Sequence, residues 1–572
     1  MQTPIVVELT DSFDDFASPP PATRNERSAT VTTDQSSEDL FVMRNTTRVR
    51  FVAGEHFYNV ELFGSLRKGG EVQFFSRGNL GLCVAVMLSV FSYGGLENVI
   101  LPLLKTQLNL TQQEALAIKH LVKLPMALSF LLGLLSDSYP ILGMRRKSYM
   151  VLGSLLFGAS AIVIGGITSH FDSSSSLTKT ESPSPGDAHV VFVILLCAFG
   201  SVGCIFTYLC VHTHVIELSQ REPLRTRGSF QASYLILRHL TSLLSSLFTY
   251  AALRSEAGGP REMRPCVSIF LLAIIAIVPL PVVWEMWRED NFSCPAASAS
   301  FPARASAYWR TVQQKAVWRI LVFICVFTLF LNVNFYDSAR VVSQWAGASA
   351  DNYLVVSTIQ DLVILLSIVV WRQWCLNLNW RILFSLGPVF AILPQLFVSI
   401  FVALDMVRDR YFYRVITSLS FVANGVTLLM TIVPVTEIIQ EGAEASTVGL
   451  VLTFQRLIAT FDSTNNGGLF QGDNFFNSSQ VASDSSSIRS SVLLSLMLNY
   501  GINALALGGI FFIPRQKLDA QQLRIYGGFT KAAAQIIAGF GLALFVYTAV
   551  MNIMSFSPSL ACHRLVGGDG CS

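Results

Sequence analysis

The stretch GLLSDSYPILGMRRK, residues 133–147, separates two long apolar runs that cover residues 114–135 and 148–169. A run of roughly 20 apolar residues is long enough for one helix to cross a lipid bilayer. The charges between the runs, above all Arg145 and Arg146, are placed to anchor at lipid headgroups. The stretch therefore predicts a short polar turn at a membrane surface, with a spanning helix on each side.

Composition extends this prediction to most of the chain. Of its 572 residues, 52% are apolar and only 13% are charged, whereas about 25% charged residues is usual for globular proteins. The mean hydropathy is +0.51, so most of the chain is expected to face lipid, which excludes a soluble protein. The net charge is +3 without a basic stripe, which argues against a nucleic-acid partner. The ten cysteines form no CxxC pair, and we expect neither a metal nor a cofactor.

Apolar runs predict thirteen spans, arranged as two halves of six with one extra. The first half is expected at 79–105, 114–135, 148–169, 189–216, 228–253 and 266–287. The second half is expected at 317–340, 352–374, 380–404, 411–437, 445–470 and 489–513, and the extra run at 530–555. The predicted organisation is a mostly disordered cytosolic tail (1–78), a six-helix half (79–288), a central cytosolic loop (289–316), a second six-helix half (317–513), and an extra helix with the C-terminal tail (514–572).

Lys and Arg residues near the span ends set the expected orientation. The basic loops are assigned to the cytosol, together with the N-terminus. The loops around Asn109 and Asn477, both glycosylation acceptors, then lie outside the cytosol or in a lumen. Arg408, Arg410 and Arg414 run against this assignment. We expect a multi-pass protein of the plasma membrane, with an internal membrane as the alternative.

A short internal repeat supports the division into two halves. The sequence VIELSQ at 215–220 recurs as VTEIIQ at 435–440, at the end of the fourth span of each half. Two parallel halves of six helices are the plan of the major facilitator superfamily, whose substrate site lies between the halves near the bilayer midplane. The repeat therefore indicates an all-α protein of this architecture.

The turn at 133–147 resembles the cytosolic signature of this superfamily, G-x-L-S-D followed by G-x-R-R-K. The matching residues are Gly133, Asp137, Gly143, Arg145, Arg146 and Lys147. The resemblance implies that they form a gate, in which glycine lets two helices approach closely and the charges bridge to a facing helix. The alternative is that the basic triplet only fixes the orientation in the membrane.

Residues 124–153, LPMALSFLLGLLSDSYPILGMRRKSYMVLG, are similar to the folate-biopterin transporter family. That family typically carries L-P-W-x-x-K ahead of G-x-x-S-D-x-x-P-I-x-G-x-R-R. This chain has Met126 where the tryptophan is usual and Ser129 where the lysine is usual. The resemblance implies a facilitator that moves a pterin or folate by alternating access, and it leaves symport with protons open.

Ionisable residues within the spans form the candidate site, because lipid does not tolerate lone charges. They are Glu97, Lys123 and Arg238 in the first half and Asp337, Asp361 and Arg456 in the second half. One interpretation is that these charges neutralise each other within the bundle and only stabilise the fold. In the other, the three bases bind substrate carboxylates and the three acids carry a coupling proton, with Lys123 and Asp361 as the first candidates.

Polar neutral residues add to this candidate site. Asn332, Asn334 and Asn424 are predicted either to read the polar edges of a substrate or to bond helices together. His120 and His239 lie near Lys123 and Arg238 in the sequence, and each can either titrate or form an interhelical hydrogen bond.

The sequence contains no G-x-x-x-x-G-K-[ST] phosphate loop and no H-E-x-x-H or G-x-S-x-G motif, so neither a P-loop pump nor a common hydrolase is expected. We predict a non-enzymatic transporter whose partners are the lipid bilayer, a small polar solute and, where transport is coupled, protons. The alternatives are a carrier of another organic anion, amino acid or nucleobase-like solute, a transporter-shaped receptor, and a multispan membrane enzyme.

Overall fold

The computed structural model describes residues 6–7, 51–52, 64–108, 110–174, 188–253, 264–289, 301–348, 353–466, 476–557 and 560–563. Most of the predicted disordered tail lies outside the described residues, and so does the predicted acceptor Asn109. The two short strands β1 (Val6–Val7) and β2 (Phe51–Val52) pair antiparallel. Nearly everything else with regular structure is helical, which confirms the predicted all-α fold.

The first half consists of six helical segments, several of which are built from shorter helices in line. They are η4–α3–η5–α4 (Arg77–Asn79, Leu80–Gly95, Leu96–Ile100, Leu101–Gln107), α5–η6–α6 (Gln112–Lys123, Leu124–Leu128, Ser129–Ser138), α7 (Lys147–Ser174), α8 (Ala188–Ser219), α9 (Ser229–Leu253) and α10–α11 (Pro265–Ile277, Leu280–Met286).

The second half follows the surface helix α12 (Phe301–Gln313). Its helices are α13 and α14 (Lys315–Leu331, Tyr336–Trp345), α15 with η9 (Tyr353–Val370, Trp371–Cys375), α16 (Trp380–Ala403), α17–α18–α19 (Arg410–Ser418, Phe421–Met430, Val433–Ile438), α20 (Glu444–Asn466), and α22 with η10 (Ser486–Ala504, Leu505–Phe511). The short helix α21 (Ser478–Ser483) precedes α22, while α23 (Lys517–Tyr526) and the long α24 (Lys531–Phe556) complete the described helices.

Every predicted span coincides with a helical segment, but the segments differ in how apolar they are. Among the described residues, ten segments are long and apolar enough to cross a membrane, or eleven if the bent pair α13–α14 is one span. The predicted spans 228–253 and 445–470 fall on α9 and α20, which do not pass this test. These two helices carry charged and hydroxyl side chains along one face, because that face lines the interior rather than lipid.

The predicted span 317–340 is broken rather than continuous. Helix α13 ends at Leu331 and α14 begins at Tyr336, with a bend of 47° between them. The backbone carbonyls freed by the break accept hydrogen bonds from Asn503, whose Nδ2 lies 2.8 Å from the carbonyl oxygen of Phe330 and 2.9 Å from that of Val333. A side-chain amide therefore replaces the missing helical hydrogen bonds, as irregular backbone within a membrane protein requires.

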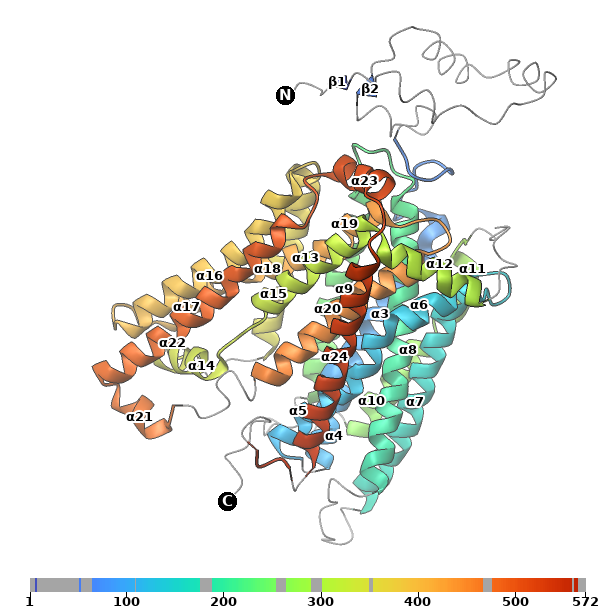
Figure 1. The fold of residues 1–572 in the computed structure, drawn as a ribbon. Helices are drawn as coiled ribbons and strands as arrows, with labels where there is room; N and C mark the ends of the chain where they lie inside the picture. The colour runs from blue at the N-terminus through green and yellow to red at the C-terminus, as the bar shows by residue number, and fades with distance from the viewer. Residues whose placement is uncertain are drawn as a thin grey trace, which may run out of the picture.

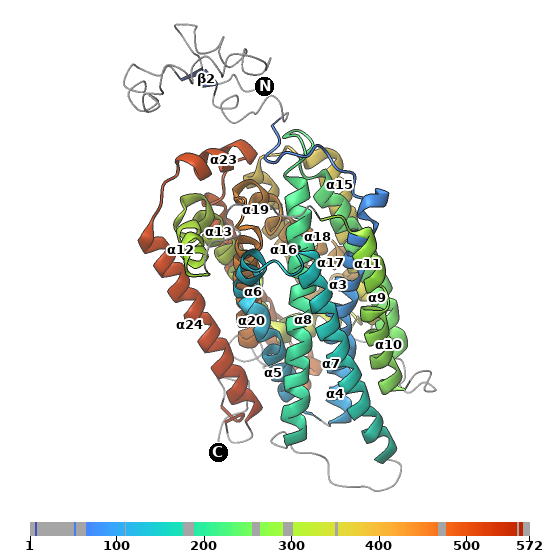
Figure 2. The same ribbon diagram turned by 90° about the vertical axis from the view of Figure 1, so that its right-hand side faces the viewer.

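The two halves are packed together at one end of the molecule and spread apart toward the other (Figure 1). Helices α19 and α23 lie at the packed end, called here the charged end because it carries Arg145, Arg146 and Glu444. Helices α4, α14 and α21 lie at the opposite end, called here the far end. The extra helix α24 runs along the outside of the bundle against α5 and α20 (Figure 2).

Glycines let α6 and α20 join the halves backbone to backbone. A Cβ atom added at Gly133 would lie 2.1 Å from the carbonyl oxygen of Ala445, and one added at Gly449 would lie 2.5 Å from that of Ser129. No larger residue fits at either position without moving the backbone of the partner helix. The close approach expected of Gly133 is therefore present, as is typical of small residues between membrane helices.

Candidate functional site

A cavity of about 190 Å³ lies inside the bundle, walled mainly by the first half. Helices α3, α8 and α9 contribute most of the wall, and Arg456 of α20 closes it from the second half. The lining side chains of α9 are Arg238, His239, Ser242, Ser245 and Ser246. Their spacing of one, four, seven and eight residues from Arg238 is that of a single helical face. The sequence of α9 therefore directs one polar stripe toward the cavity.

Two arginines, Arg238 and Arg456, line this cavity, and each contacts a tyrosine. The Nη1 atom of Arg238 donates to the hydroxyl of Tyr208 at 2.9 Å, and its guanidinium lies 4.7 Å from the centre of that ring. The Nη1 atom of Arg456 donates to the hydroxyl of Tyr93 at 2.7 Å, and its guanidinium lies 4.8 Å from that ring. Arg456 also lies 5.9 Å from the ring of Tyr208, so one tyrosine links both cations.

The partners of the two arginines are neutral. Among the described residues, neither Arg238 nor Arg456 forms an ion pair with a carboxylate. Each guanidinium keeps N–H donors that a single tyrosine hydroxyl does not satisfy. Each side chain is partly exposed and lines the cavity. The arrangement offers two cations, with aromatic faces beside them, to an anionic ligand.

His239 connects the cavity to the second half of the protein. Its Nδ1 atom lies 3.1 Å from Oδ1 of Asp361 on α15, and both side chains are buried. The Nε2 atom of His239 has no hydrogen-bond partner in the described structure. The predicted acid Asp361 and the predicted neighbour of Arg238 therefore form one hydrogen-bonded pair between the halves.

The predicted charges Lys123 and Glu97 pair with each other, and Glu97 also accepts a hydrogen bond from the hydroxyl of Tyr93, the partner of Arg456. Lys123 is 2.5 Å from Glu97, which Lys119 also approaches at 3.0 Å. None of these three side chains lines the cavity. Both interpretations of these charges, as scaffold and as part of a substrate site, stay predictions.

Asp337 is likewise engaged outside the cavity. Its carboxylate accepts from Nε of Arg340 at 2.9 Å and from the backbone N–H of Phe476 at 2.6 Å. Asn332 and Asn424 are exposed and do not line the cavity, and the backbone N–H of Asn334 is bonded to Asn466. Of the predicted site residues, the structure thus brings together Arg238, Arg456 and, through His239, Asp361.

The signature residues build a network of ion pairs at the charged end. Arg146 is fully buried, and its guanidinium bonds Asp137 and Glu217 at 2.8 Å, Ser136 at 2.9 Å and Glu444 at 3.3 Å. Burial opposes ionisation of Arg146, but the carboxylates, Glu217 foremost, hold its pKa well above the usual value. This arginine is therefore a permanent cation matched by several carboxylates.

The same network bridges the two halves. Arg145 lies 3.3 Å from Glu444, and Arg67 also pairs with Glu444. The carboxylate of Asp137 accepts from the backbone N–H groups of Ala445 at 3.2 Å and Ser446 at 2.8 Å, at the start of α20. An acid at a helix N-terminus is favoured because the helix dipole is positive there.

The remaining signature residues support this turn. The carboxylate of Glu289 accepts from three consecutive backbone N–H groups, those of Arg145, Arg146 and Lys147, at 2.8 to 2.9 Å. Gly143 has a φ of 76°, a conformation that favours glycine. The gate role of the signature stays a prediction, but its residues do form one connected structure.

The two copies of the internal repeat meet at this end. Nε2 of Gln220 donates to the backbone carbonyl of Thr436 at 2.8 Å, and Nη1 of Arg227 pairs with Glu437 at 2.7 Å. Glu217 is bound by Arg146 within its own half, whereas Glu437 is bound by Arg227 from the other half. The repeated glutamates therefore serve different contacts.

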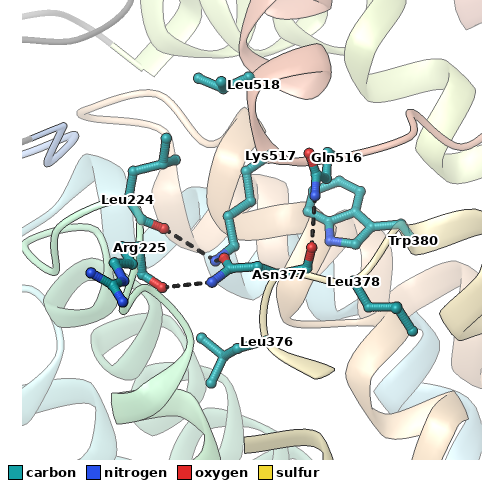
Figure 3. A pocket seen from close by; sticks show the side chains of 9 residues that line it. All are labelled: Leu224, Arg225, Leu376, Asn377, Leu378, Trp380, Gln516, Lys517 and Leu518. Atoms are coloured by element: carbon teal, nitrogen blue, oxygen red, sulfur yellow. Dashed lines mark hydrogen bonds between the residues drawn. The ribbon is translucent and has the colours of Figure 1, made fainter. Parts of the chain in front are cut away.

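A second cavity of about 230 Å³ lies beside these contacts (Figure 3). Lys517 donates to the carbonyl oxygen of Arg227 at 2.8 Å, to that of Leu224 at 3.2 Å and to Oδ1 of Asn377 at 3.0 Å. The Nδ2 atom of Asn377 donates to the carbonyl oxygen of Arg225 at 3.1 Å. Burial lowers the pKa of Lys517 to about 8. These hydrogen bonds connect the start of α23 to the first half of the protein.

Sequence reasoning missed three participants. Tyr93 and Tyr208 could not be singled out among 15 tyrosines and 41 phenylalanines. Glu444 opens α20 about 300 residues from the arginines that it binds, so no local pattern could reveal the pairing. A polar stripe at helical spacing along α9 was the available signal for the cavity.

Comparison with known proteins gives three similarities. The BT1 family model matches residues 96–519. A folate-biopterin transporter of Synechocystis sp. is 28% identical over 224 residues, which are 39% of this chain and 39% of that protein. The chain thus matches well under half the length of this relative.

The third similarity is structural. The proton:xylose symporter XylE of the major facilitator superfamily, solved with 6-bromo-6-deoxy-D-glucose bound, superposes with a TM-score of 0.51. The match covers 82% of this chain and 100% of that one at 14% identity. At this identity the likeness shows the fold alone.

Proposed function

The chain belongs to the BT1 family and has the major facilitator fold, and from this premise we propose that it transports a pterin or folate by alternating access, coupled to protons. The family match and the folate-biopterin relative agree with the resemblance of residues 124–153. Both similar proteins are named as a transporter or a symporter rather than an enzyme. Alternating access is the general mechanism of carriers with two such halves.

The observation that carries the proposed substrate class is the pair of arginines without carboxylate partners. A buried cation is costly unless an anion neutralises it. Arg238 and Arg456 line the cavity with only tyrosine hydroxyls as partners in the described structure. A folate carboxylate would supply the missing charge, and Tyr93 and Tyr208 present flat aromatic surfaces to a heterocyclic ring.

The proposed coupling site is the His239–Asp361 pair. It joins the lining of the cavity to α15 of the second half. A carboxylate and an imidazole in contact share protons readily, and their charge depends on the occupant of the cavity beside them. Proton uptake there would change the contact between the halves, as coupling requires.

The test uses the full-length protein in proteoliposomes with radiolabelled folate and radiolabelled biopterin, at two external pH values. We expect uptake of both compounds and stronger uptake with an inward proton gradient. Changing Arg238 or Arg456 to Gln should reduce folate kcat/KM by about tenfold to 100-fold, because each substitution removes a charge-assisted hydrogen bond worth about 1.5–3 kcal/mol.

A matched control separates the substrate site from general loss of positive charge. Arg340→Gln removes an arginine that is paired with Asp337 outside the cavity, and it should leave folate uptake near the wild-type value. Biopterin lacks carboxylates, so its uptake should fall less than that of folate in the two cavity variants. Unchanged folate uptake by both cavity variants would refute this binding mode.

A carrier of another organic anion is the second candidate, and one observation favours it. Met126 lines the cavity where the family usually has tryptophan. Ser129, where lysine is usual, is buried and donates to the backbone carbonyl of Met126. Competition of labelled folate uptake by a panel of unlabelled mono- and dicarboxylates would identify such a substrate.

A further inference from the structure

Asp462 is a buried carboxylate that the cavity does not use. It lies on α20, six residues beyond Arg456, which corresponds to about 9 Å along a helix toward the far end. Its exposed fraction is 1%. Neither carboxylate oxygen has a hydrogen-bond partner in the described structure. The polar side chain that approaches it is that of Asn332, at the break between α13 and α14.

A cluster of apolar side chains lies on the turn of α20 that precedes Asp462. Leu457 and Ile458 of α20 form one buried cluster with Leu544 of α24, and Leu329 of α13 packs against it. Phe461, next to Asp462 in the sequence, belongs to the same packing. An ionised carboxylate in such a place would lack both water and a counter-ion.

The titratable groups on the neighbouring helices are engaged elsewhere. His120 of α5 bonds Ser463 at 2.9 Å and Asn552 at 2.9 Å, and Tyr547 of α24 donates to Asn465 at 2.7 Å. Several charged groups on the elements packed against α20 have partners of their own. Lys119 and Lys123 of α5 pair with Glu97, and Asp137 of α6 and Glu217 of α8 pair with Arg146. Glu114 of α5 caps its own helix at Thr111, Arg319 of α13 bonds the carbonyl oxygen of Phe512, and Lys315 and Lys531 lie at the first residues of α13 and α24.

A metal cation is a poor candidate for the missing charge. Sodium sites in transporters use backbone carbonyls freed where a helix is unwound. Here the carbonyls of the break already accept hydrogen bonds, from Asn503 at Phe330, Leu331 and Val333 and from Asn466 at Asn332, and a cation would have to compete with these donors. A proton needs only the carboxylate itself.

We propose that Asp462 is a second proton-binding site, which holds a proton when the halves are packed at the charged end and releases it as the contact with the α13–α14 break changes. Asn466, one turn beyond Asp462, bonds both the carbonyl of Asn332 and the N–H of Asn334. Helix α20 therefore holds the break through Asn466, one turn beyond Asp462. The coupling of this proton to transport rests on the proposed function, whereas its presence does not.

Infrared difference spectroscopy of the purified full-length protein tests the presence of the proton without any substrate. The wild type should show the carbonyl band of a neutral carboxylic acid at pH 7, and Asp462→Asn should lose it. Asp484→Asn, which removes a carboxylate bound by two arginines, should retain the band. A band that survives in Asp462→Asn, or is absent in the wild type, overturns the proposal.

Unfolding and transport provide the second readout. Asn is nearly isosteric with Asp, and thermal unfolding of Asp462→Asn shows whether the variant is folded; Asp462→Leu gives a second variant without a titratable group. Wild-type stability should decline as the pH rises and the buried acid loses its proton, and this component should be missing in both variants.

In proteoliposomes, Asp462→Asn should lower pH-driven accumulation of labelled folate by about tenfold or more, while folate exchange stays within about twofold. Unchanged accumulation would overturn the coupling. A wild type that fails to take up folate would instead contradict the proposed function, and the infrared result would still decide whether Asp462 holds a proton.

Discussion

The arginines at the charged end and those at the central cavity have opposite kinds of partner. Arg146 at the charged end is surrounded by Asp137, Glu217 and Glu444. Arg238 and Arg456 in the cavity have tyrosine hydroxyls instead, and no carboxylate among the described residues. All three side chains are arginines on membrane helices or their ends, so residue type alone does not distinguish their roles.

The difference indicates which charges belong to the scaffold. A cation whose carboxylates come from its own chain is neutral as a unit, and it holds the elements that contribute those carboxylates. A cation left with neutral partners gains most from an anion that arrives from outside. Counter-ions within the protein therefore separate structure from binding more clearly than depth in the membrane does.

The largest effect on stability is expected from removing the arginine at the charged end. Arg146→Gln should lower the free energy of unfolding by about 3–5 kcal/mol, because it leaves buried carboxylates without their cation. Arg456→Gln should change it by less than about 1 kcal/mol, since it removes a partly exposed charge that has no carboxylate partner among the described residues. Thermal unfolding of both purified variants, followed by tryptophan fluorescence, measures the contrast. Equal destabilisation by the two substitutions would contradict it.

A double-mutant cycle measures how strongly the Arg145–Glu444 pair holds the two halves together. Arg145→Gln and Glu444→Gln each break the pair across the charged end, and their coupling should be about 0.5–3 kcal/mol. Opening can be followed by the alkylation rate of Ser446→Cys, at a position buried beside this pair. We expect about tenfold faster alkylation in Arg145→Gln, which corresponds to about 1.4 kcal/mol. Additive single effects would show that the pair does not hold the end closed.

Lys517 gives a pH-dependent effect of intermediate size at the same end. Its pKa is lowered by burial from 10.5 to about 8. Between these values the packed structure binds fewer protons than a hydrated lysine does, so stability should rise with pH across this window, by about 2–3 kcal/mol. Lys517→Met should lack this rise. Thermal unfolding of both proteins from pH 7.5 to about 10 decides the matter.

The smallest effect is expected at the far end. Arg408 and Arg489 both bond Asp484 and hold its pKa below the usual value. Such a group adds stability at neutral pH that is lost as the pH falls into the acid range. Because the cluster is partly exposed, Asp484→Asn should cost less than about 1 kcal/mol. Asn tolerates the positive φ of 46° at this position, so a larger loss in an unfolding experiment would show that the cluster is more than a surface contact.

Local sequence pattern was sufficient to place a helix at each predicted span and to find the turn at 133–147, although it did not show the break at 317–340 or the polar character of α9 and α20. The run 148–169 predicts a helix that the structure extends to Lys147–Ser174, and the turn contains the residues that bond to one another there. The break after Leu331 could not be predicted, because it depends on Asn503, which lies 173 residues from Phe330. Asp462 falls within the predicted span 445–470 but is not among the candidate ionisable residues, because the sequence around it, FDSTNNGGLF, is polar.

The sequence was sufficient to name ionisable residues within the spans, but not to show which of them lie together. Arg238 and Arg456 were named from their depth, and the structure lines one cavity with both. Lys123 was a first candidate on the same grounds, yet it pairs with Glu97. Depth in a span is encoded locally, whereas the partner of a charge depends on helix rotation and packing. The partner of a charge can therefore be identified only from the tertiary structure.

If the two halves rock against each other, the glycine contact between α6 and α20 would act as a fulcrum. Gly133 and Gly449 allow the two backbones to touch, so neither helix can advance further toward the other at that point, although each can tilt about it. Asp462 lies 13 residues beyond Gly449, which is about 20 Å along the helix. A tilt of about 10° at the fulcrum would therefore displace that carboxylate by about 3 Å. A lever of this length converts a small angular change at one membrane face into the making or breaking of a contact near the other.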